Sequence, residues 1–186
     1  MKKRSGYIDL LINNAGIARN LYPHPLPSPG RSQCSASTIT NFQAVLWETG
    51  TTDDFAETFQ TNVTAIYYAT VAFLELLDLG NIRRRKTDDN NRSSFPHLTS
   101  QVLSVSSSGS FRIDPKVLSP SYTLAKAACT HLGRMLANLL APWGIRSNVL
   151  APGVWPSGKS STSAPCPWHE HARGLLIYIA DVFVQK

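Results

Sequence analysis

Cysteine is scarce in this 186-residue sequence, and long apolar runs are missing. The three cysteines, Cys34, Cys129 and Cys166, are an odd number at wide spacing, which is not the pattern of a disulfide framework. A reducing compartment, the cytoplasm, is therefore expected. No uninterrupted apolar stretch approaches the roughly 20 residues that cross a membrane, so no membrane partner is expected. The apolar run at residues 8–12 is interrupted by Asp9 and is too short for a secretory signal.

An excess of positive charge is present but modest. Lys and Arg total 18 against 12 Asp and Glu, a net charge of +6, and hydrophobic residues make up 42% of the chain. These values exclude a disordered chain, a collagen-like repeat and a coiled coil, and the length fits one domain. Four cations are consecutive, at 83–86, but Asp88 and Asp89 follow them and no aromatic residue interleaves with the run. That pattern is typical of a solvated loop, so no nucleic-acid partner is expected.

Three short apolar runs have the continuous pattern of strands that helices cover on both faces. They lie at residues 8–12, 102–105 and 148–151. A long helix is predicted between the first two, with Thr52 as its cap and an apolar stripe of Phe55, Phe59, Ile66, Ala69, Phe73 and Leu76. A second helix is predicted from about Ser121 to Leu140, because Pro142 and Gly144 end it. This alternation predicts an α/β fold with a parallel sheet and right-handed crossovers.

Two segments are predicted to be surface loops. Residues 21–50 begin with a series of prolines, and residues 81–97 are charged and polar. Near the end of the chain, the apolar segment 174–184 can form a strand or a buried helix. No metal site is predicted, because a Pro-rich segment offers three possible ligands without a fourth. Those three residues are Cys166, His169 and His171.

One polar residue falls on the apolar stripe of the first helix. Asn62 stands between Phe59 and Ile66, where the spacing calls for an apolar side chain. A buried amide without hydrogen-bond partners costs about 1–3 kcal/mol. From the spacing alone, a core amide bonded to neighbouring backbone is a sufficient interpretation, and a functional amide is the alternative.

Tyr122 and Lys126 stand four residues apart near the start of the second helix, so they share one face of it. A tyrosine phenol, with an ordinary pKa of about 10, is a poor acid or base at neutral pH. An ammonium group beside a phenol favours the phenolate and makes it usable in proton transfer. Taken alone, this spacing is common, and a surface pair explains it more simply.

Small and polar residues follow each of the three predicted strands. The first strand runs into residues 13–16, the second into Ser106–Ser108 and the third into Pro152–Val154. In an open parallel sheet, ligands bind outside the carboxyl ends of the strands. The three turns therefore meet at one edge of the sheet, beside the start of the Tyr122 helix, which predicts a ligand site there.

Five short motifs stand in a fixed order along the chain. They are Asn-Asn-Ala-Gly at 13–16, Asn-Val-Thr-Ala at 62–65, Val-Ser-Ser at 105–107, Tyr-x-x-x-Lys at 122–126 and a strand ending in Pro-Gly at 148–153. In this order they resemble the motifs of the short-chain dehydrogenase/reductase family, most of all its 3-oxoacyl-acyl-carrier-protein reductase-like members. The resemblance implies a partial Rossmann-type, doubly wound parallel sheet in residues 1–157, followed by a tail at 158–186 that is unlike the family.

The resemblance implies an NAD(P)-dependent oxidoreductase that acts on a small carbonyl or alcohol, with NADP favoured over NAD, and a homo-oligomer paired through the two long helices. Tyr122 would exchange a proton with the substrate oxygen, and Lys126 would assist Tyr122 and bind the nicotinamide ribose. Ser107 would hydrogen-bond the substrate, and Asn62 would hold a water of the proton relay. Besides Tyr122 and Lys126, the implied cofactor contacts are Asn14, Ala15 and Gly16 on the adenosine side and Pro152, Gly153 and Val154 at the nicotinamide.

Two features depart from the family pattern. The spacing from Ser107 to Tyr122 is slightly long, so Ser106 or Ser108 can take the serine's role. No Gly-x-Gly-x-x-Gly or Gly-x-x-x-Gly-x-Gly motif occurs, and the family's two N-terminal βαβ units are not recognisable. We therefore expect the 186-residue chain to bind its cofactor poorly or not at all. The alternative to an enzyme is a non-catalytic, truncated fragment that acts as an interaction module through an unpaired sheet edge.

Overall fold

The computed structural model of the chain describes residues 6–29, 38–90, 98–114, 117–153 and 178–179. Strands alternate with helices along these residues, as the periodicity predicts. The strands are β1 (Leu10–Asn13), β2 (Gln101–Val105), β3 (Arg146–Ala151) and β4 (Tyr178–Ile179). The α-helices are α1 (Ile39–Trp47), α2 (Thr52–Phe59), α3 (Ala65–Asn90) and α4 (Pro120–Leu140). Shorter helical turns are η1 (Gln60–Thr64), η2 (Ser108–Phe111) and η3 (Ala141–Trp143).

The strands form one sheet in the order β1-β2-β3-β4. β1 pairs with β2 and β2 with β3, both in parallel, with Gln101 opposite Leu10 on one side and Arg146 on the other. The predicted parallel sheet is confirmed. β4 adds an antiparallel strand, with Tyr178 opposite Ala151, so the strand alternative holds for this part of the apolar segment near the end of the chain.

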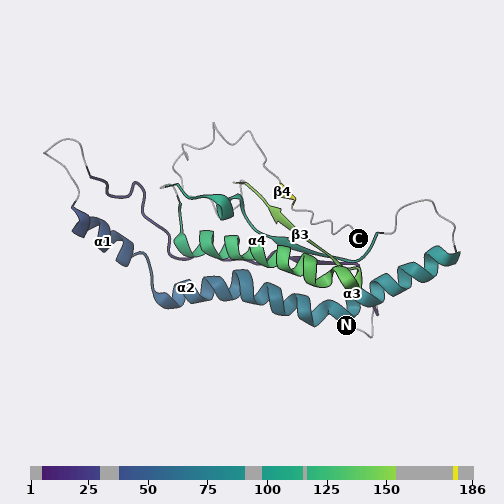
Figure 1. Cartoon of the computed structure of the whole chain (residues 1–186). Coiled ribbons are helices and arrows are strands. Elements are labelled where there is room, and N and C mark those ends of the chain that lie inside the picture. Colours follow the sequence, from purple (N-terminus) through teal and green to yellow (C-terminus); the bar gives the residue numbers. More distant parts are fainter. Residues whose placement is uncertain (1–5, 30–37, 91–97, 115–116, 154–177, 180–186) are drawn as a thin grey trace, which may run out of the picture.

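Helices α2 and α3, joined through η1, form one long rod that runs beside α4 on the same face of the sheet (Figure 1). Both crossovers connect neighbouring parallel strands in the same direction, and a shared right hand places both on one face. Among the described residues, no helix covers the other face, where Leu10 is 49% and Ile12 is 53% exposed. The sequence prediction of helices on both faces is therefore met on one face only within the described residues.

The core lies between the rod, α4 and the sheet. Leu77 of α3, Val102 of β2 and Leu136 of α4 pack together in one buried cluster. Helix α4 approaches β3 closely at Gly133, where an added Cβ would lie 2.1 Å from Cγ2 of Val149. Because such a contact is sterically forbidden, Gly133 allows α4 to rest directly on the sheet, and this packing sets the height of the whole helix.

The predicted start and buried stripe of the first helix need correction. Thr51, not Thr52, caps α2: its hydroxyl accepts from the Asp54 N–H, and the Asp54 carboxylate accepts from the Thr51 N–H. The fully buried side chains of the rod include Thr58, Asn62, Thr70 and Leu77, whereas Phe55, Phe59 and Phe73 are half-buried. The threonines can be buried because their hydroxyls donate to carbonyls one turn earlier, which leaves no polar group unpaired.

Both predicted loops contain helix. Within 21–50, α1 forms because Thr38 caps it by accepting from the Asn41 N–H. Within 81–97, α3 continues to Asn90, and only residues 91–97 lie outside the described part. Arginine and lysine are good helix formers, and Arg83 and Arg84 are tied to Asp9 by ion pairs of 3.2 and 3.1 Å. The basic run therefore extends the helix instead of ending it.

The rod from Thr52 to Lys86 is long and apolar enough to cross a membrane when judged by length and composition alone. Its buried side chains Ile66, Leu76 and Leu77 belong to the protein core. Only 28% of the apolar window is buried, and one helix of this kind is weak evidence for a membrane span.

Candidate functional site

The turn that follows β1 reaches the rod and α4 at Gly16. An added Cβ at Gly16 would lie 3.0 Å from Asn62 Oδ1 and 3.3 Å from Lys126 Nζ. Asn14 and Ala15 of the same turn are exposed. A glycine therefore lets the turn lie directly against two of the predicted site residues, which come from different helices and are brought together at this point.

Lys126 is a buried cation at this edge. Its side chain is 3% exposed, and its Nζ donates a 2.7 Å hydrogen bond to the Val105 carbonyl at the end of β2. The same Nζ lies 5.7 Å from the centroid of the half-buried Tyr122 ring. Burial lowers the pKa of Lys126, and the nearby Cys129 opposes that shift. Of the described residues, no carboxylate forms an ion pair with Lys126.

The three serines after β2 have different environments. Ser106 is buried, and its hydroxyl donates to the Lys126 carbonyl at 2.8 Å and shares a 2.6 Å hydrogen bond with the Thr130 hydroxyl. Ser107 is half-buried and starts η2, where its hydroxyl accepts from the Gly109 N–H at 3.0 Å. The Ser108 N–H donates to the Pro152 carbonyl at 2.8 Å, which joins the ends of β2 and β3.

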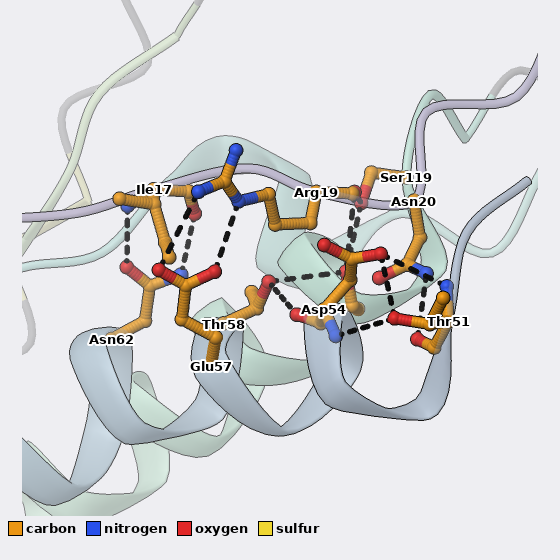
Figure 2. Close-up of polar contacts among 10 residues, drawn as sticks. Ile17, Arg19, Asn20, Thr51, Asp54, Glu57, Thr58, Asn62 and Ser119 are labelled. Atoms are coloured by element: carbon orange, nitrogen blue, oxygen red, sulfur yellow. Dashed lines mark hydrogen bonds and ion pairs between the residues drawn. The ribbon is translucent and has the colours of Figure 1, made fainter.

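Asn62 is fully buried and bonds to backbone in both directions (Figure 2). Its Oδ1 accepts from the Ile17 N–H at 3.0 Å, and its Nδ2 donates to the Ile17 carbonyl at 2.8 Å. The interpretation of Asn62 as a core amide bonded to neighbouring backbone is confirmed. Asn62 also lies within η1, a π-helical turn, and such wide turns occur frequently at functional sites.

The structure thus gathers Gly16, Asn62, Lys126 and Tyr122 around one corner at the carboxyl edge of the sheet. The loop of Ser107 is tied to this edge through Pro152. Pro152 and Gly153 are half-buried, and an added Cβ at Gly153 would meet no atom within 4 Å. Val154 lies outside the described residues, as do the cysteine and the two histidines considered as metal ligands. In the described part of the chain, no cluster of three or more His, Cys, Asp and Glu residues could hold a metal ion.

Sequence reasoning missed the residues that support this corner from the start of α4. Ser119 caps α4, with Pro120 as the first helical residue, and its hydroxyl also reaches the Arg19 carbonyl. A serine followed by a proline at the start of a helix is a recognised capping signal. The cap was therefore readable from the sequence, but its bond to a residue 100 positions away was not.

Comparison with known proteins gives consistent matches. A profile described as short chain dehydrogenase matches residues 1–163. The short-chain dehydrogenase/reductase VdtF of Byssochlamys spectabilis is 40% identical over 164 residues, which cover 82% of this chain and 50% of that protein. The Pseudomonas aeruginosa RhlG/NADP active-site complex matches with a TM-score of 0.55 and 24% identity, over 84% of this chain and 46% of that one. A 3-ketoacyl-(acyl-carrier-protein) reductase from Brucella melitensis, complexed with NADH, matches with a TM-score of 0.53 and 20% identity, over 82% and 47%.

The chain spans about half the length of the curated relatives that it matches. At these identities the solved structures show the fold, and the Rossmann-type α/β architecture predicted from the sequence is confirmed. The sites of those proteins do not transfer to this chain by likeness alone. The chemistry of the corner must be argued from its own residues.

Proposed function

This chain belongs to the short-chain dehydrogenase family, as the five motifs predicted, and from that premise we propose that it is an NAD(P)-dependent oxidoreductase of a small carbonyl or alcohol. The observation that carries the proposal is the buried ammonium of Lys126, 5.7 Å from the centroid of the Tyr122 ring and not paired with any described carboxylate. A buried cation without a counter-charge costs stability, and groups with perturbed pKa values cluster at functional sites.

Tyr122 is the proposed proton donor to the substrate oxygen in reduction and the acceptor in oxidation. The ammonium of Lys126 lies 5.7 Å from the centroid of the Tyr122 ring, which puts a positive charge near the group that is proposed to exchange the proton. A bound nicotinamide supplies or accepts the hydride. The proton delivered by Tyr122 completes the reduction of the carbonyl to an alcohol, and the reverse transfer completes the oxidation.

The residues present fit the ribose side of such a cofactor. An ammonium has three N–H donors, and in the described structure Lys126 gives one hydrogen bond, to the Val105 carbonyl. The other N–H groups suit ribose hydroxyls. Gly16 keeps the neighbouring space free of a side chain, beside the exposed Asn14 and Ala15. Pro152 and Gly153 are the proposed nicotinamide contacts, together with Val154.

Ser107 is the proposed substrate-binding serine. The Ser106 hydroxyl is buried and engaged beneath α4, so it is poorly placed to meet a ligand. The Ser107 hydroxyl accepts a hydrogen bond from Gly109, and its own proton is free to be donated to a substrate oxygen. Ser108 remains the alternative, because it lies on the same short loop.

The η1 turn that contains Asn62 is the proposed holder of a water in the proton relay. The Asn62 amide is bonded to Ile17 through both Oδ1 and Nδ2, so the side chain mainly fixes the turn after β1. The widened η1 turn disturbs the regular helical hydrogen-bond pattern. Backbone groups of this turn are therefore better candidates than the side chain to bind the water.

We also propose a homo-oligomer paired through the two long helices, and the exposed apolar face of these helices supports it. Tyr67 and Tyr68 of α3 and Met135 and Leu139 of α4 are 42–65% exposed. A shallow groove of about 500 Å³ lies between the same helices, lined by Tyr67, Leu132, Met135, Leu136, Asn138 and Leu139. Exposed apolar patches of this kind mark protein interfaces. The choice between NAD and NADP, with NADP favoured, and a cytoplasmic location remain predictions from the sequence.

The test is turnover of a panel of small ketones and alcohols by the 186-residue chain. NADH, NADPH and their oxidised forms are supplied at millimolar concentration, because the sequence contains no Gly-rich phosphate-binding turn. We expect transfer of deuterium from deuterated cofactor to the alcohol carbon, at a rate that Tyr122→Phe lowers at least about 100-fold. Equal rates in the two proteins would contradict the proposal, and no transfer by either would favour a non-catalytic chain.

A further inference from the structure

A short irregular segment, Ile17–Tyr22, links the rod to the start of α4; we call it the strap (Figure 2). The Ile17 backbone is held by Asn62 of η1. The Arg19 side chain forms an ion pair with Glu57 of α2, at 3.1 Å. At its far end, the Tyr22 N–H donates to the Leu118 carbonyl at 2.8 Å, just before α4. The strap is thus bonded along its length to both helices that carry the proposed site.

The Ser119 hydroxyl takes part in three hydrogen bonds, one of which is a 3.3 Å contact with the Ser121 hydroxyl. The Ser119 Oγ accepts from the Tyr122 N–H at 3.1 Å and so caps α4. The same Oγ donates to the Arg19 carbonyl at 2.5 Å, and the side chain is 2% exposed. Ser121, which is fully buried, also donates to the Arg19 carbonyl, at 3.2 Å. The backbone amide of Tyr122 is therefore held by a group that is itself fixed to the strap.

These bonds connect the proposed proton donor to the rest of the site. From Tyr122 the chain of contacts runs through Ser119 to the strap, then through Ile17 to Asn62. Asn62 lies against the same Gly16 turn that meets Lys126. Ser121 also links α4 to the rod, because its hydroxyl lies 3.5 Å from that of Thr58 in a hydrogen bond. The bond from Ser119 to Arg19 adds to this link, because it fixes the first turn of α4 to a segment clamped by Asn62.

We propose that Ser119 is a positioning residue for Tyr122, and that it acts through the hydrogen bond to the Arg19 carbonyl and not only as a helix cap. The proposal rests on the proposed oxidoreductase function, in which Tyr122 must reach the substrate oxygen. A misplacement of about 1 Å can cost about 100-fold in rate. Efficient turnover therefore depends on a first turn that is held at two points.

The decisive variant is Ser119→Gly. Glycine is nearly as good as serine as a helix cap, so α4 persists while the bond to Arg19 is lost. Ser119→Thr keeps a hydroxyl that can both cap and donate. Thr38→Gly is the matched control, because Thr38 caps α1 and its hydroxyl makes no bond to the strap. Ser121→Ala removes the weaker bond to the Arg19 carbonyl, together with the contacts of the Ser121 hydroxyl with those of Ser119 and Thr58, and serves if Ser119→Gly fails to fold.

We expect Ser119→Gly to lower kcat about 10-fold with the KM for cofactor unchanged, because the phenol is less well placed against the substrate oxygen. Ser119→Thr should stay within about 2-fold of the wild type, and Thr38→Gly should change neither quantity. Ser121→Ala should lower kcat by a smaller factor. A wild-type kcat in folded Ser119→Gly, or an equal loss of kcat in Thr38→Gly, would overturn the proposal.

Amide hydrogen exchange separates this proposal from the proposed function. Ser119→Gly should speed exchange at Ile17 and Tyr22 about 10-fold, and Thr38→Gly should leave both amides protected. If the wild-type chain turns over no substrate but these amides respond, the oxidoreductase function fails and the strap contact stands. If the amides do not respond, Ser119 does not fix the strap, whatever the turnover.

Discussion

Charged and polar side chains have different partners at the amino and carboxyl ends of the parallel strands. At the amino end, Asp9 is paired with Arg83 and Arg84, and the buried Asn81 amide bonds the Ser100 N–H and the carbonyls of Trp143 and Gly144. At the carboxyl end, the buried Lys126 ammonium is met by one carbonyl and no described carboxylate. Opposite charges and amide hydrogen bonds at the first end serve structural stability. The unpaired charge at the second end marks the place where a ligand and a reaction are expected.

The largest expected effect is on kcat, and the KM for cofactor should distinguish Tyr122 from Lys126 at the carboxyl end. Tyr122→Phe should lower kcat about 1,000-fold and leave cofactor affinity unchanged, because only the transferable proton is lost. Lys126→Met should lower kcat and also raise the KM for cofactor about 10-fold, because the ammonium is proposed to serve both the phenol and the ribose. Steady-state kinetics with cofactor varied measures the contrast. The same pattern in both variants would show that the two roles are wrongly assigned.

A substitution at the amino end should lower the free energy of unfolding and leave kcat unchanged. Asn81→Ala removes three hydrogen bonds and leaves the buried Ser100 N–H without its acceptor, so we expect a loss of about 3 kcal/mol in the free energy of unfolding. Denaturant unfolding measures this loss. At a temperature where the variant is folded, its kcat should equal that of the wild type. A fall in the kcat of the folded Asn81→Ala variant would show that the amino end also contributes to catalysis, which contradicts the distinction between the two ends.

Replacing Lys126 should stabilise the folded chain, whereas replacing Asn81 should destabilise it. Burial lowers its pKa, so the native state carries a desolvated charge at neutral pH and none above the ordinary lysine value of 10.5. In the window between the lowered pKa and 10.5, folding releases a proton and the free energy of unfolding rises with pH. We expect Lys126→Met to stabilise the chain by about 1 kcal/mol at pH 7, with the gain vanishing as pH rises through this window. The exposed Lys86→Met is the control, and a pH-independent gain would show that desolvation of the ammonium is not its cause.

The smallest effect is expected for the ion pairs of the amino end. Arg83 and Asp9 are partly exposed, with side-chain exposures of 43% and 34%, so water and salt screen their attraction. Arg83→Gln should cost less than about 1 kcal/mol in the free energy of unfolding, and high salt should reduce that cost. A loss comparable to that of Asn81→Ala would mean that charge pairing, and not the buried amide, holds this end together.

The sequence predicted the fold best where periodicity is local. The β2 run and the α4 pattern matched the structure to within a residue at most boundaries, because continuous apolar runs and a Pro-Gly end signal depend on neighbours in the chain. The extent of α3 was wrong, since the pairing of Arg83 with Asp9 joins residues far apart in sequence. The helix α1 was also missed, because the prolines before Thr38 masked its capping signal.

The candidate site was predictable as a set of residues but not as a geometry. The edge at which Gly16, Asn62 and Lys126 meet follows from the parallel sheet and its right-handed crossovers. The bonds that hold this corner do not follow from spacing. The Asn62 amide bonds to the backbone of Ile17, 45 residues away, and the Ser119 hydroxyl bonds to the backbone of Arg19. Only the folded chain brings these groups together.

The contrast between the two ends is tested most directly by the titration of the Lys126 ammonium. NMR of the chain with isotope-labelled lysine, assigned with Lys126→Met, follows this group with pH, without cofactor and with millimolar NADH or NADPH. We predict that Lys126 titrates below 10.5 in the free chain and that its signal shifts when cofactor is added. If Lys126 titrates at or above 10.5 and its signal does not shift when cofactor is added, the assignment of the carboxyl end as the functional one is contradicted.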